Sequence, residues 1–202
     1  MNSNTVYKAF SSTCEEFGNH PFLHIPDTAA PYNTGSIDAS YQKTLEEIDS
    51  LASNYENAGY KINNRVGLFL ENRIDFFCHW LALNKIGCSV IPLHPDMQSG
   101  EIAYFLEHGE AVLVVSLPHK KSELQEICKN IKNNPPVMCT DSSADIPIAK
   151  SFPQNSDMPS GSTECALLYT SGSTGKPKGC ILDNNYFLYA GYWYNSIGGL
   201  ME

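Results

Sequence analysis

The sequence predicts an α/β fold with a largely parallel sheet flanked by helices. Short apolar stretches rich in valine, isoleucine and leucine alternate along it with segments whose apolar residues recur every three or four positions. Strands that alternate with helices of this length indicate βαβ units, and such units join parallel strands by right-handed crossovers. With 202 residues, 42% of them hydrophobic, the chain can bury a sizeable core.

The first helix of this pattern begins near residue 41. Its apolar side chains recur at steps of three and four, at Tyr41, Leu45, Ile48, Leu51, Ala52 and Tyr55. This spacing places them on one face of an amphipathic helix. Asp38 and Ser40 are candidate caps before it, and Gly59 ends it.

Strands of one sheet are expected at residues 66–70, 88–92, 111–115 and 136–140, where the sequence is short, apolar and partly β-branched. The helix between the first two strands is apolar nearly all round, as expected of a helix covered on two sides. Asn72 is its candidate cap, and Gly87 stops it. Further helices are expected near 99–108 and near 120–132.

Residues 141–163 differ in character, because serine, proline and aspartate dominate there and periodicity is lost. We expect an exposed linker within the domain. The next stretch, "CALLYT", is a short apolar strand whose end leads directly into a loop of glycines, hydroxyl residues and lysines. Ligand-binding loops of open α/β sheets commonly lie at that end of a strand.

The loop "TSGSTGKPKG", residues 170–179, has the chemistry of a polyphosphate site. Glycines allow backbone N–H groups to approach an anion, hydroxyls donate to phosphate oxygens or reach Mg²⁺, and lysines neutralise charge. A flexible surface turn is the plain alternative. The density of donors, the two lysines and the position after a strand favour the phosphate site.

A P-loop is the rival explanation, and the spacing argues against it. Only two residues separate Gly172 from Gly175, where GxxxxGK[ST] requires four, and Pro177 follows Lys176 in place of serine or threonine. "CILD" then resumes as an apolar stretch. We therefore expect strands on both sides of an exposed loop at 170–178, and no helix beginning at Lys176.

"YTSGSTGKPKG", residues 169–179, resembles the phosphate-binding signature of the adenylate-forming superfamily, which contains acyl-CoA synthetases, luciferases and peptide-synthetase adenylation domains. The resemblance extends upstream to about residue 40, including Lys85, Gly87 and Pro92 in a K-x-G-x-x-x-x-P spacing. Within this superfamily, the sequence most resembles the carnitine and crotonobetaine CoA ligases. Asn64 stands where an aspartate is usual, which we expect to be a change in a surface turn.

The resemblance implies the N-terminal part of the large domain of an adenylate-forming enzyme. It implies activation of a carboxylic acid by ATP, with Mg²⁺, to an acyl-adenylate, followed by transfer of the acyl group to coenzyme A. By match to the signature, the ATP-binding residues are Thr170, Ser171, Gly172, Ser173, Thr174, Gly175, Lys176 and Lys178. Lys178 occupies the family's invariant lysine position, and no catalytic nucleophile is required from this segment.

The family's downstream motifs and C-terminal domain do not occur before the final "GGLME". We therefore expect residues 1–202 to be an N-terminal fragment that is inactive by itself. The alternative is a catalytically inactive truncated homologue, or an interaction module that retains the sheet.

The composition excludes several other classes of function. A net charge of −9 without a basic cluster argues against nucleic-acid binding. The seven cysteines are odd in number and never spaced as CxxC, so reduced thiols are expected, and Cys78, Cys88 and Cys139 lie in apolar runs. The N-terminus lacks the pattern of a secretory signal and no segment is apolar enough for a transmembrane helix, so a cytoplasmic protein is expected.

Other residues that could carry chemistry are His20 with His24, Cys78 with His79, and His94 with Asp96. Pro21 interrupts the spacing of the first pair, so a surface turn is expected there. The second pair lies on a helix expected to be buried, where packing explains it. The third lies in "PLHPDM", where a turn-forming role is favoured over acid–base chemistry.

Overall fold

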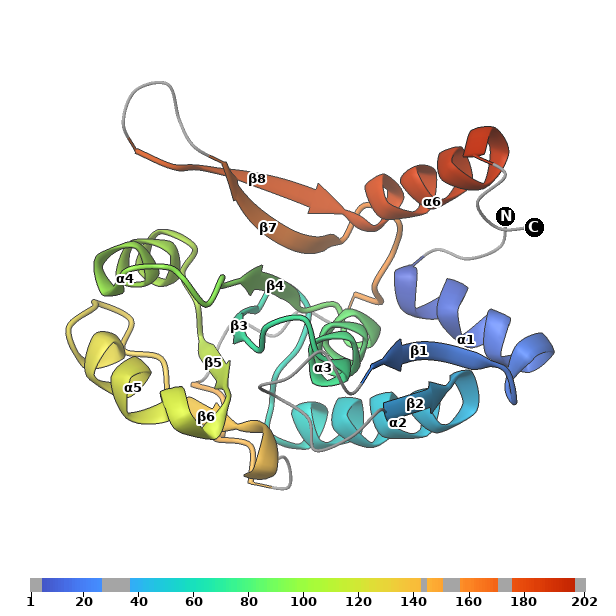
Figure 1. Ribbon diagram of the computed structural model, residues 1–202. Coiled ribbons are helices and arrows are strands. Elements are labelled where there is room, and N and C mark those ends of the chain that lie inside the picture. The colour runs from blue at the N-terminus through green and yellow to red at the C-terminus, as the bar shows by residue number, and fades with distance from the viewer. Residues whose placement is uncertain (1–4, 27–36, 143–144, 151–156, 171–175, 199–202) are drawn as a thin grey trace.

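The computed structural model describes residues 5–26, 37–142, 145–150, 157–170 and 176–198 (Figure 1). Its helices are α1 (Val6–Phe17), α2 (Tyr41–Asn57), α3 (Ile74–Lys85), α4 (Ser99–His108), α5 (Lys121–Lys129) and α6 (Asn184–Gly198). Its strands are β1 (Pro21–Ile25), β2 (Ile37–Ser40), β3 (Arg65–Phe69), β4 (Ser89–Pro92), β5 (Leu113–Ser116), β6 (Val137–Cys139), β7 (Glu164–Thr170) and β8 (Lys178–Asp183).

The main sheet has the strand order β6-β5-β3-β4-β7-β8. Strands β3, β4, β5 and β6 pair in parallel, and β7 joins β4 in parallel at Val90 and Ala166. Only the last pair, β7 with β8, is antiparallel within this sheet. The largely parallel α/β sheet expected from the sequence is confirmed, and the four expected strands lie within two residues of their expected bounds.

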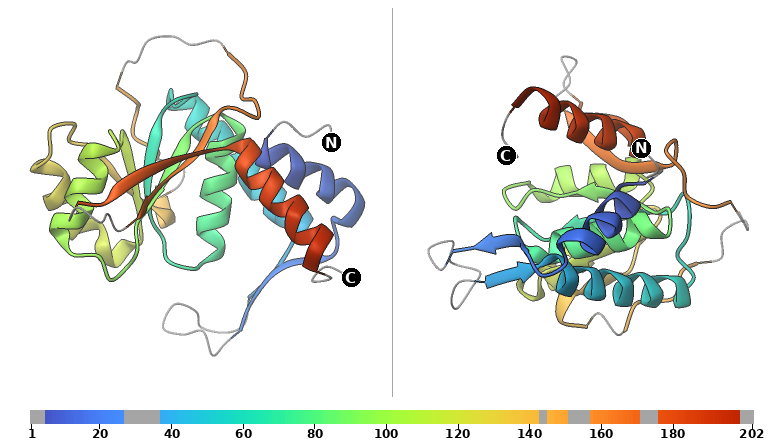
Figure 2. Two further views of the ribbon diagram at one scale, coloured as in Figure 1. Left: turned by 90° about the horizontal axis from the view of Figure 1, so that it is seen from above. Right: turned by 90° about the vertical axis from the view of Figure 1, so that its right-hand side faces the viewer.

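Helices cover the two faces of the sheet and enclose two apolar cores. One core joins α1, α2 and α3 to the sheet around Ile48, Leu68 and Leu83. The other joins α4 and α5 to the opposite face around Leu106 and Leu124. In the right-hand view of Figure 2, α6 and the β7–β8 pair lie above α1 and α2.

Gly67 allows α4 to approach the sheet closely. A Cβ atom at Gly67 would lie 2.7 Å from Cδ2 of Leu106, whose side chain is fully buried against β3. Real Cβ contacts are longer, so a side chain here would force the end of the Leu106 side chain to shift. The lack of a side chain in the middle of β3 therefore lets the strand and the helix pack closely.

The N-cap expected from the sequence is confirmed for α2 and is wrong for α3. Ser40 caps α2, because its Oγ accepts a hydrogen bond from the backbone N–H of Lys43 over 3.3 Å. The cap expected at Asn72 is wrong. Arg73 occupies the N-cap position of α3 without a capping side-chain bond, and its Nε donates to Asp75 in the first turn. The negative charge of Asp75 suits the N-terminal end of the helix dipole.

Asn64 is buried, which corrects the expectation of a surface turn. Its side chain is only 5% exposed, and its Oδ1 accepts a hydrogen bond from the N–H of Lys61. Its backbone carbonyl accepts from the N–H of Ser89, the first residue of β4. Asn64 therefore closes the turn after α2 and helps to set the register of two central strands.

Two buried asparagines connect three helices. Nδ2 of Asn84 on α3 donates to Oδ1 of Asn184, at the start of α6, over 2.8 Å. In the first turn of α1, the N–H of Tyr7 donates to Oδ1 of Asn84 and the N–H of Val6 donates to Oδ1 of Asn184. The first N–H groups of a helix have no partner within it, so these asparagines satisfy donors that would otherwise be unpaired. The arrangement explains why α6 packs beside α1 in Figure 1.

None of the helices in the described part of the chain has the length and apolar character needed to cross a bilayer.

Candidate functional site

The expected phosphate loop connects β7 to β8. These strands pair antiparallel from Glu164 and Asp183 to Thr170 and Lys178, so the last pair brackets residues 171–177. Strand on both sides of the loop is confirmed. Because β8 begins at Lys178, a strand follows where a P-loop would require a helix, and the P-loop alternative is excluded.

The structure places three of the eight expected ATP-binding residues. Thr170, Lys176 and Lys178 are exposed, and the first and last lie opposite each other on the two strands. Ser171, Gly172, Ser173, Thr174 and Gly175 lie outside the described residues, and their expected role stays a prediction. A hydroxyl and an ammonium group that project from adjacent strand ends can both reach one anionic ligand.

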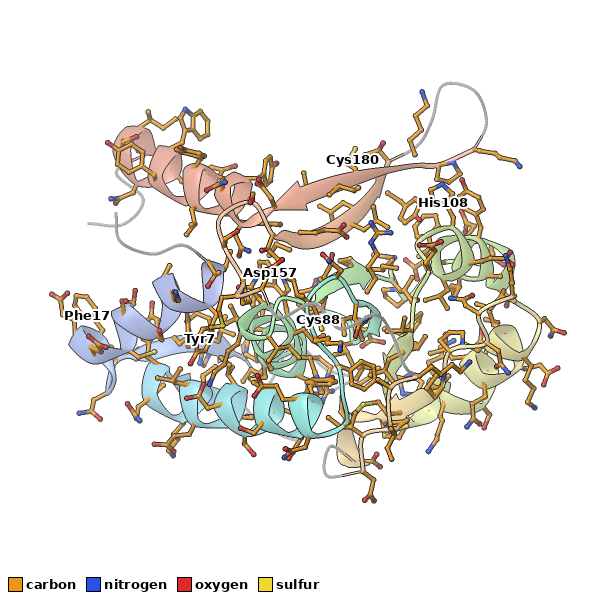
Figure 3. All side chains as sticks on the ribbon, turned by 180° about the vertical axis from the view of Figure 1, so that it is seen from behind. Tyr7, Phe17, Cys88, His108, Asp157 and Cys180 are labelled. Carbon is orange, nitrogen blue, oxygen red and sulfur yellow. The ribbon has the colours of Figure 1, made fainter. Side chains whose placement is uncertain are left out.

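An aromatic cluster lies under the strand ends that hold the loop. We call Tyr104, Phe105 and His108 of α4, together with Tyr169 of β7, the α4–β7 aromatic cluster. The rings of Phe105 and Tyr169 stack with centroids 3.9 Å apart and planes 18° apart, and the ring of Tyr104 stacks on His108 at 5.3 Å. In Figure 3, His108 lies on α4 beside the strand pair on which Cys180 is labelled.

Hydrogen bonds from this cluster reach both sides of the loop. Nδ1 of His108 lies 2.8 Å from the hydroxyl of Tyr169, the residue before Thr170. The hydroxyl of Tyr104 donates to the carbonyl of Pro177, the residue before Lys178, over 3.1 Å. Burial raises the pKa of Tyr169 to about 12, so its phenol stays protonated and remains able to donate.

The other end of β7 is held by an ion pair. Arg65, the first residue of β3, donates from Nε and Nη2 to the two carboxylate oxygens of Glu164, each over 2.7 Å. The two side chains are 22% and 17% exposed, so water screens this bidentate pair only partly. The pKa of Arg65 is raised chiefly by its hydrogen bonds to Glu164. The strand that leads to the loop is therefore fixed at both of its ends.

Close backbone contact also joins α4 to β7. Gly109 follows α4, and a Cβ atom there would lie 2.5 Å from Cδ1 of Ile91 and 3.1 Å from Cδ2 of Leu167. The helix end can approach β4 and β7 this closely because the residue lacks a side chain.

The remaining candidate residues have structural explanations. His20 lies in an exposed turn, whereas His24 lies in β1 and contacts Asp38. Cys78 is buried on α3, as expected. The Nδ1 of His94 accepts a hydrogen bond from the N–H of Asp96, which confirms a turn.

His79 is buried beside Cys78 and lies 2.7 Å from the hydroxyl of Tyr55 on α2 through its Nδ1. Burial lowers the pKa of His79 to about 4, opposed by the charge of Asp75, so the ring is neutral at pH 7. It joins α2 to α3, as the packing explanation requires.

All seven cysteines are free thiols, and six of them are buried. Cys180 on β8 is exposed. Among the described residues, no group of three or more histidine, cysteine, aspartate or glutamate side chains is arranged to hold a metal ion.

A cavity of about 710 Å³ lies away from the loop. It is bounded by Arg65, Glu107, Glu110, Lys132 and Lys150, near the amino ends of β3 and β5. Ligands of open α/β sheets bind outside the carboxyl ends of the strands, so position argues for the loop after β7 and against this cavity as the nucleotide site.

Sequence comparison finds peptide synthetases and CoA ligases among the relatives. Over 146 residues the chain is 30% identical to the polyketide synthase-nonribosomal peptide synthetase ffsA of Aspergillus flavipes, covering 72% of this chain and 3% of that protein. Over 178 residues it is 29% identical to the crotonobetaine/carnitine–CoA ligase of Proteus mirabilis (strain HI4320), covering 78% of this chain and 34% of the ligase. The chain thus spans about a third of the length of that ligase.

Solved structures share the fold. VinN in complex with 3-methylaspartate superimposes with a TM-score of 0.76 at 18% identity, covering 96% of this chain and 52% of VinN. The N-terminal subdomain of Klebsiella oxytoca NpsA superimposes with a TM-score of 0.70 at 20% identity, covering 91% of this chain and 43% of that protein.

The sequence of residues 10–200 matches the AMP-binding enzyme family, and this range contains the whole sheet together with the strand–loop–strand signature. The chain therefore belongs to the family of AMP-binding enzymes.

Proposed function

We propose that the protein activates a carboxylic acid with ATP and that the loop between β7 and β8 holds the β- and γ-phosphates. The observation that carries the proposal is the strand–loop–strand arrangement of the signature, with Thr170 and Lys178 paired at the strand ends. Family membership across residues 10–200 supports it. The two strand ends are fixed to the rest of the fold, which suits a loop that must present several donors at once.

In the first half-reaction, a carboxylate oxygen attacks the α-phosphorus of ATP. The bond from this phosphorus to the bridging oxygen of the β-phosphate breaks, and pyrophosphate leaves. In this proposal the ammonium group of Lys178 neutralises negative charge on the departing phosphates, and the hydroxyl of Thr170 donates to the same group. Both residues are exposed and paired at the strand ends, which supports these roles.

Mg²⁺ supplies further charge neutralisation when it is bound. It is usually held by substrate phosphates, waters and one or two protein oxygens, and it does not need a cage of protein ligands. The exposed hydroxyl of Thr170 is a suitable oxygen donor, and it lies beside Lys178.

We further propose that coenzyme A accepts the acyl group in the second half-reaction. Its thiol attacks the carbonyl carbon of the acyl-adenylate, a thioester forms, and AMP leaves. The crotonobetaine/carnitine–CoA ligases among the relatives support this choice. A fatty or betaine-type acid is the first candidate substrate. An amino acid is the second, since VinN has been solved with 3-methylaspartate.

Acid-dependent exchange of labelled pyrophosphate into ATP tests the first half-reaction in the full-length protein. Fatty acids, betaine-type acids and amino acids would be supplied separately, each with Mg²⁺ and without coenzyme A. Exchange with one class of acid, followed by thioester formation when coenzyme A is added, is the expected result.

Two results would argue against parts of the proposal. Exchange without thioester formation would remove coenzyme A as the acceptor and leave adenylation in place. Absence of exchange with every acid would favour the alternative, a non-catalytic relative or interaction module that retains the sheet.

A further inference from the structure

We propose that Tyr104 and His108 of α4 are positioning residues that fix both ends of the phosphate loop before ATP binds. This inference rests on the proposed function of the loop. It assigns a role to a helix that lies outside the signature and to side chains more than 60 residues before it in the sequence.

The end of the loop is held through Pro177. The hydroxyl of Tyr104 donates to the carbonyl oxygen of Pro177, and this carbonyl belongs to the peptide group that carries the N–H of Lys178. Proline fixes its own φ, so orienting its carbonyl orients the peptide that leads into β8. The direction in which the Lys178 side chain leaves the strand depends on that peptide.

The start of the loop is held through Tyr169. Its ring stacks on Phe105, and its hydroxyl lies 2.8 Å from Nδ1 of His108. Thr170 is the next residue, and successive side chains on a strand point to opposite faces. Because Tyr169 is fixed against α4, Thr170 is directed away from α4.

The two attachments form one unit. Tyr104 and His108 lie one helical turn apart, and their rings stack with planes 29° apart. Leu106 and Ile102 anchor α4 on the sheet with side chains 0% and 1% exposed. The helix therefore offers a rigid base to the β7–β8 pair. This pair joins the rest of the sheet through β4, with one register pair, Val90 and Ala166.

The physical consequence is preorganisation. A strand pair held at its sides has less freedom to lose when a polyphosphate binds, so the same donors give tighter binding. Losing one attachment should weaken the binding of ATP and of pyrophosphate. It should affect the later transfer to a thiol much less, because the pyrophosphate has left by then.

Four variants of the full-length protein test this by pyrophosphate exchange with the acid it activates. Tyr104→Phe removes only the hydroxyl that holds Pro177. His108→Leu removes the nearer of two partners of the Tyr169 hydroxyl, the other being the carbonyl of Phe105 at 3.4 Å. His108→Asn restores a polar group near the position of Nδ1. Tyr189→Phe, at a tyrosine of α6 that is 69% exposed, is the matched control.

We expect Tyr104→Phe and His108→Leu each to raise the KM for ATP by about 3- to 10-fold, the usual effect of losing one hydrogen bond. His108→Asn should recover most of the loss, and Tyr189→Phe should match the wild type. Thioester formation from supplied acyl-adenylate should change by less than about 2-fold in all four.

Three results would overturn the inference. A KM for ATP equal to that of Tyr189→Phe in both loss variants, while Lys178→Ala impairs exchange, would leave the proposed function standing without a role for α4. A lower thermal midpoint with an unchanged KM would show that the cluster only stabilises the fold. Absence of exchange in the wild type would remove the proposed function and this inference together.

Discussion

At the scale of single residues, the two lysines around Pro177 occupy different positions. Lys178 is the first residue of β8 and pairs with Thr170, whereas Lys176 precedes the strand and is exposed. A side chain on a paired strand has a fixed origin, so its ammonium group loses less freedom when it binds a phosphate. Lys178 is therefore the better candidate for a strong phosphate contact.

Lys178→Ala should slow pyrophosphate exchange by roughly 10- to 100-fold, because a hydrogen bond to a charged group contributes about 1.5–3 kcal/mol. Lys176→Ala should cost distinctly less. Thioester formation from supplied acyl-adenylate should stay nearly intact in both. Equal and negligible effects at the two lysines would instead mean that the loop is an ordinary surface turn.

Cys180 should be the one thiol of the native chain that reacts rapidly with an aromatic disulfide reagent. The other six cysteines are buried, and burial raises the pKa of several of them, to about 11 for Cys128 and about 12 for Cys165. All seven should react after denaturation. Cys180→Ser should abolish the rapid phase, and a rapid phase of the same size in that variant would contradict the burial of the others.

The residue types of the loop were sufficient to predict its flanking strands and the failure of the P-loop pattern, because local chemistry determines both. That its ligand is a polyphosphate stays a prediction. The cap at Asn72 was predicted wrongly because a helix start can shift by one residue at little cost, and Arg73 with Asp75 supports the later start. Asn64 looked like a surface residue because its burial depends on β4, which lies far from it in sequence.

At the scale of elements, β7 is the strand that carries the loop, and it depends on the ion pair between Arg65 and Glu164. Glu164→Gln should lower the free energy of unfolding by about 1.5–3 kcal/mol, since two charge-assisted hydrogen bonds to a partly buried guanidinium are weakened. Urea denaturation measures the change.

Glu126→Gln is the matched control for this prediction. Glu126 pairs with Lys129 on the surface of α5, where both side chains are more than two-thirds exposed, and such pairs contribute little. If the two variants unfold at the same urea concentration, the Arg65–Glu164 pair does not stabilise β7.

Periodicity predicted α2, α4 and the four parallel strands because each buries one face or is buried entirely. The helix α1 was missed, although Val6, Phe10 and Cys14 recur at steps of four and Thr5 caps it. The helix α6 was also missed: its aromatic residues include several that are exposed, which weakens its periodicity, whereas Asp183, which accepts from the N–H of Tyr186, signals its start. The contact of α4 with the loop is tertiary and leaves no local pattern.

At the scale of the whole molecule, buried His79 makes stability depend on pH. Its pKa is about 4 in the fold, against an ordinary value of 6.5, so the unfolded chain binds a proton more readily. The contribution of His79 to the free energy of unfolding is therefore fully present above pH 6.5. It is lost as the pH falls toward 4, by up to about 3 kcal/mol. Urea unfolding at pH 7 and at pH 5 should show the decline.

His79→Gln retains a partner for Tyr55 and does not titrate, so its stability should decline less over the same range. His20→Gln changes an exposed histidine and should keep the wild-type slope. Parallel curves for His79→Gln and the wild type would show that other groups cause the decline.

The single register pair between β4 and β7, Val90 with Ala166, has a consequence for local opening of the native state. The amides of β3 and β5 are held inside a parallel ladder with several pairs on both sides, whereas β8 bonds only to β7. Amide hydrogen exchange should therefore divide the sheet into two cooperative units, with β7 and β8 exchanging before β3 and β5. ATP with Mg²⁺ should slow amide exchange in β7 and β8 alone. The protection of these two strands would then report on nucleotide binding without any turnover.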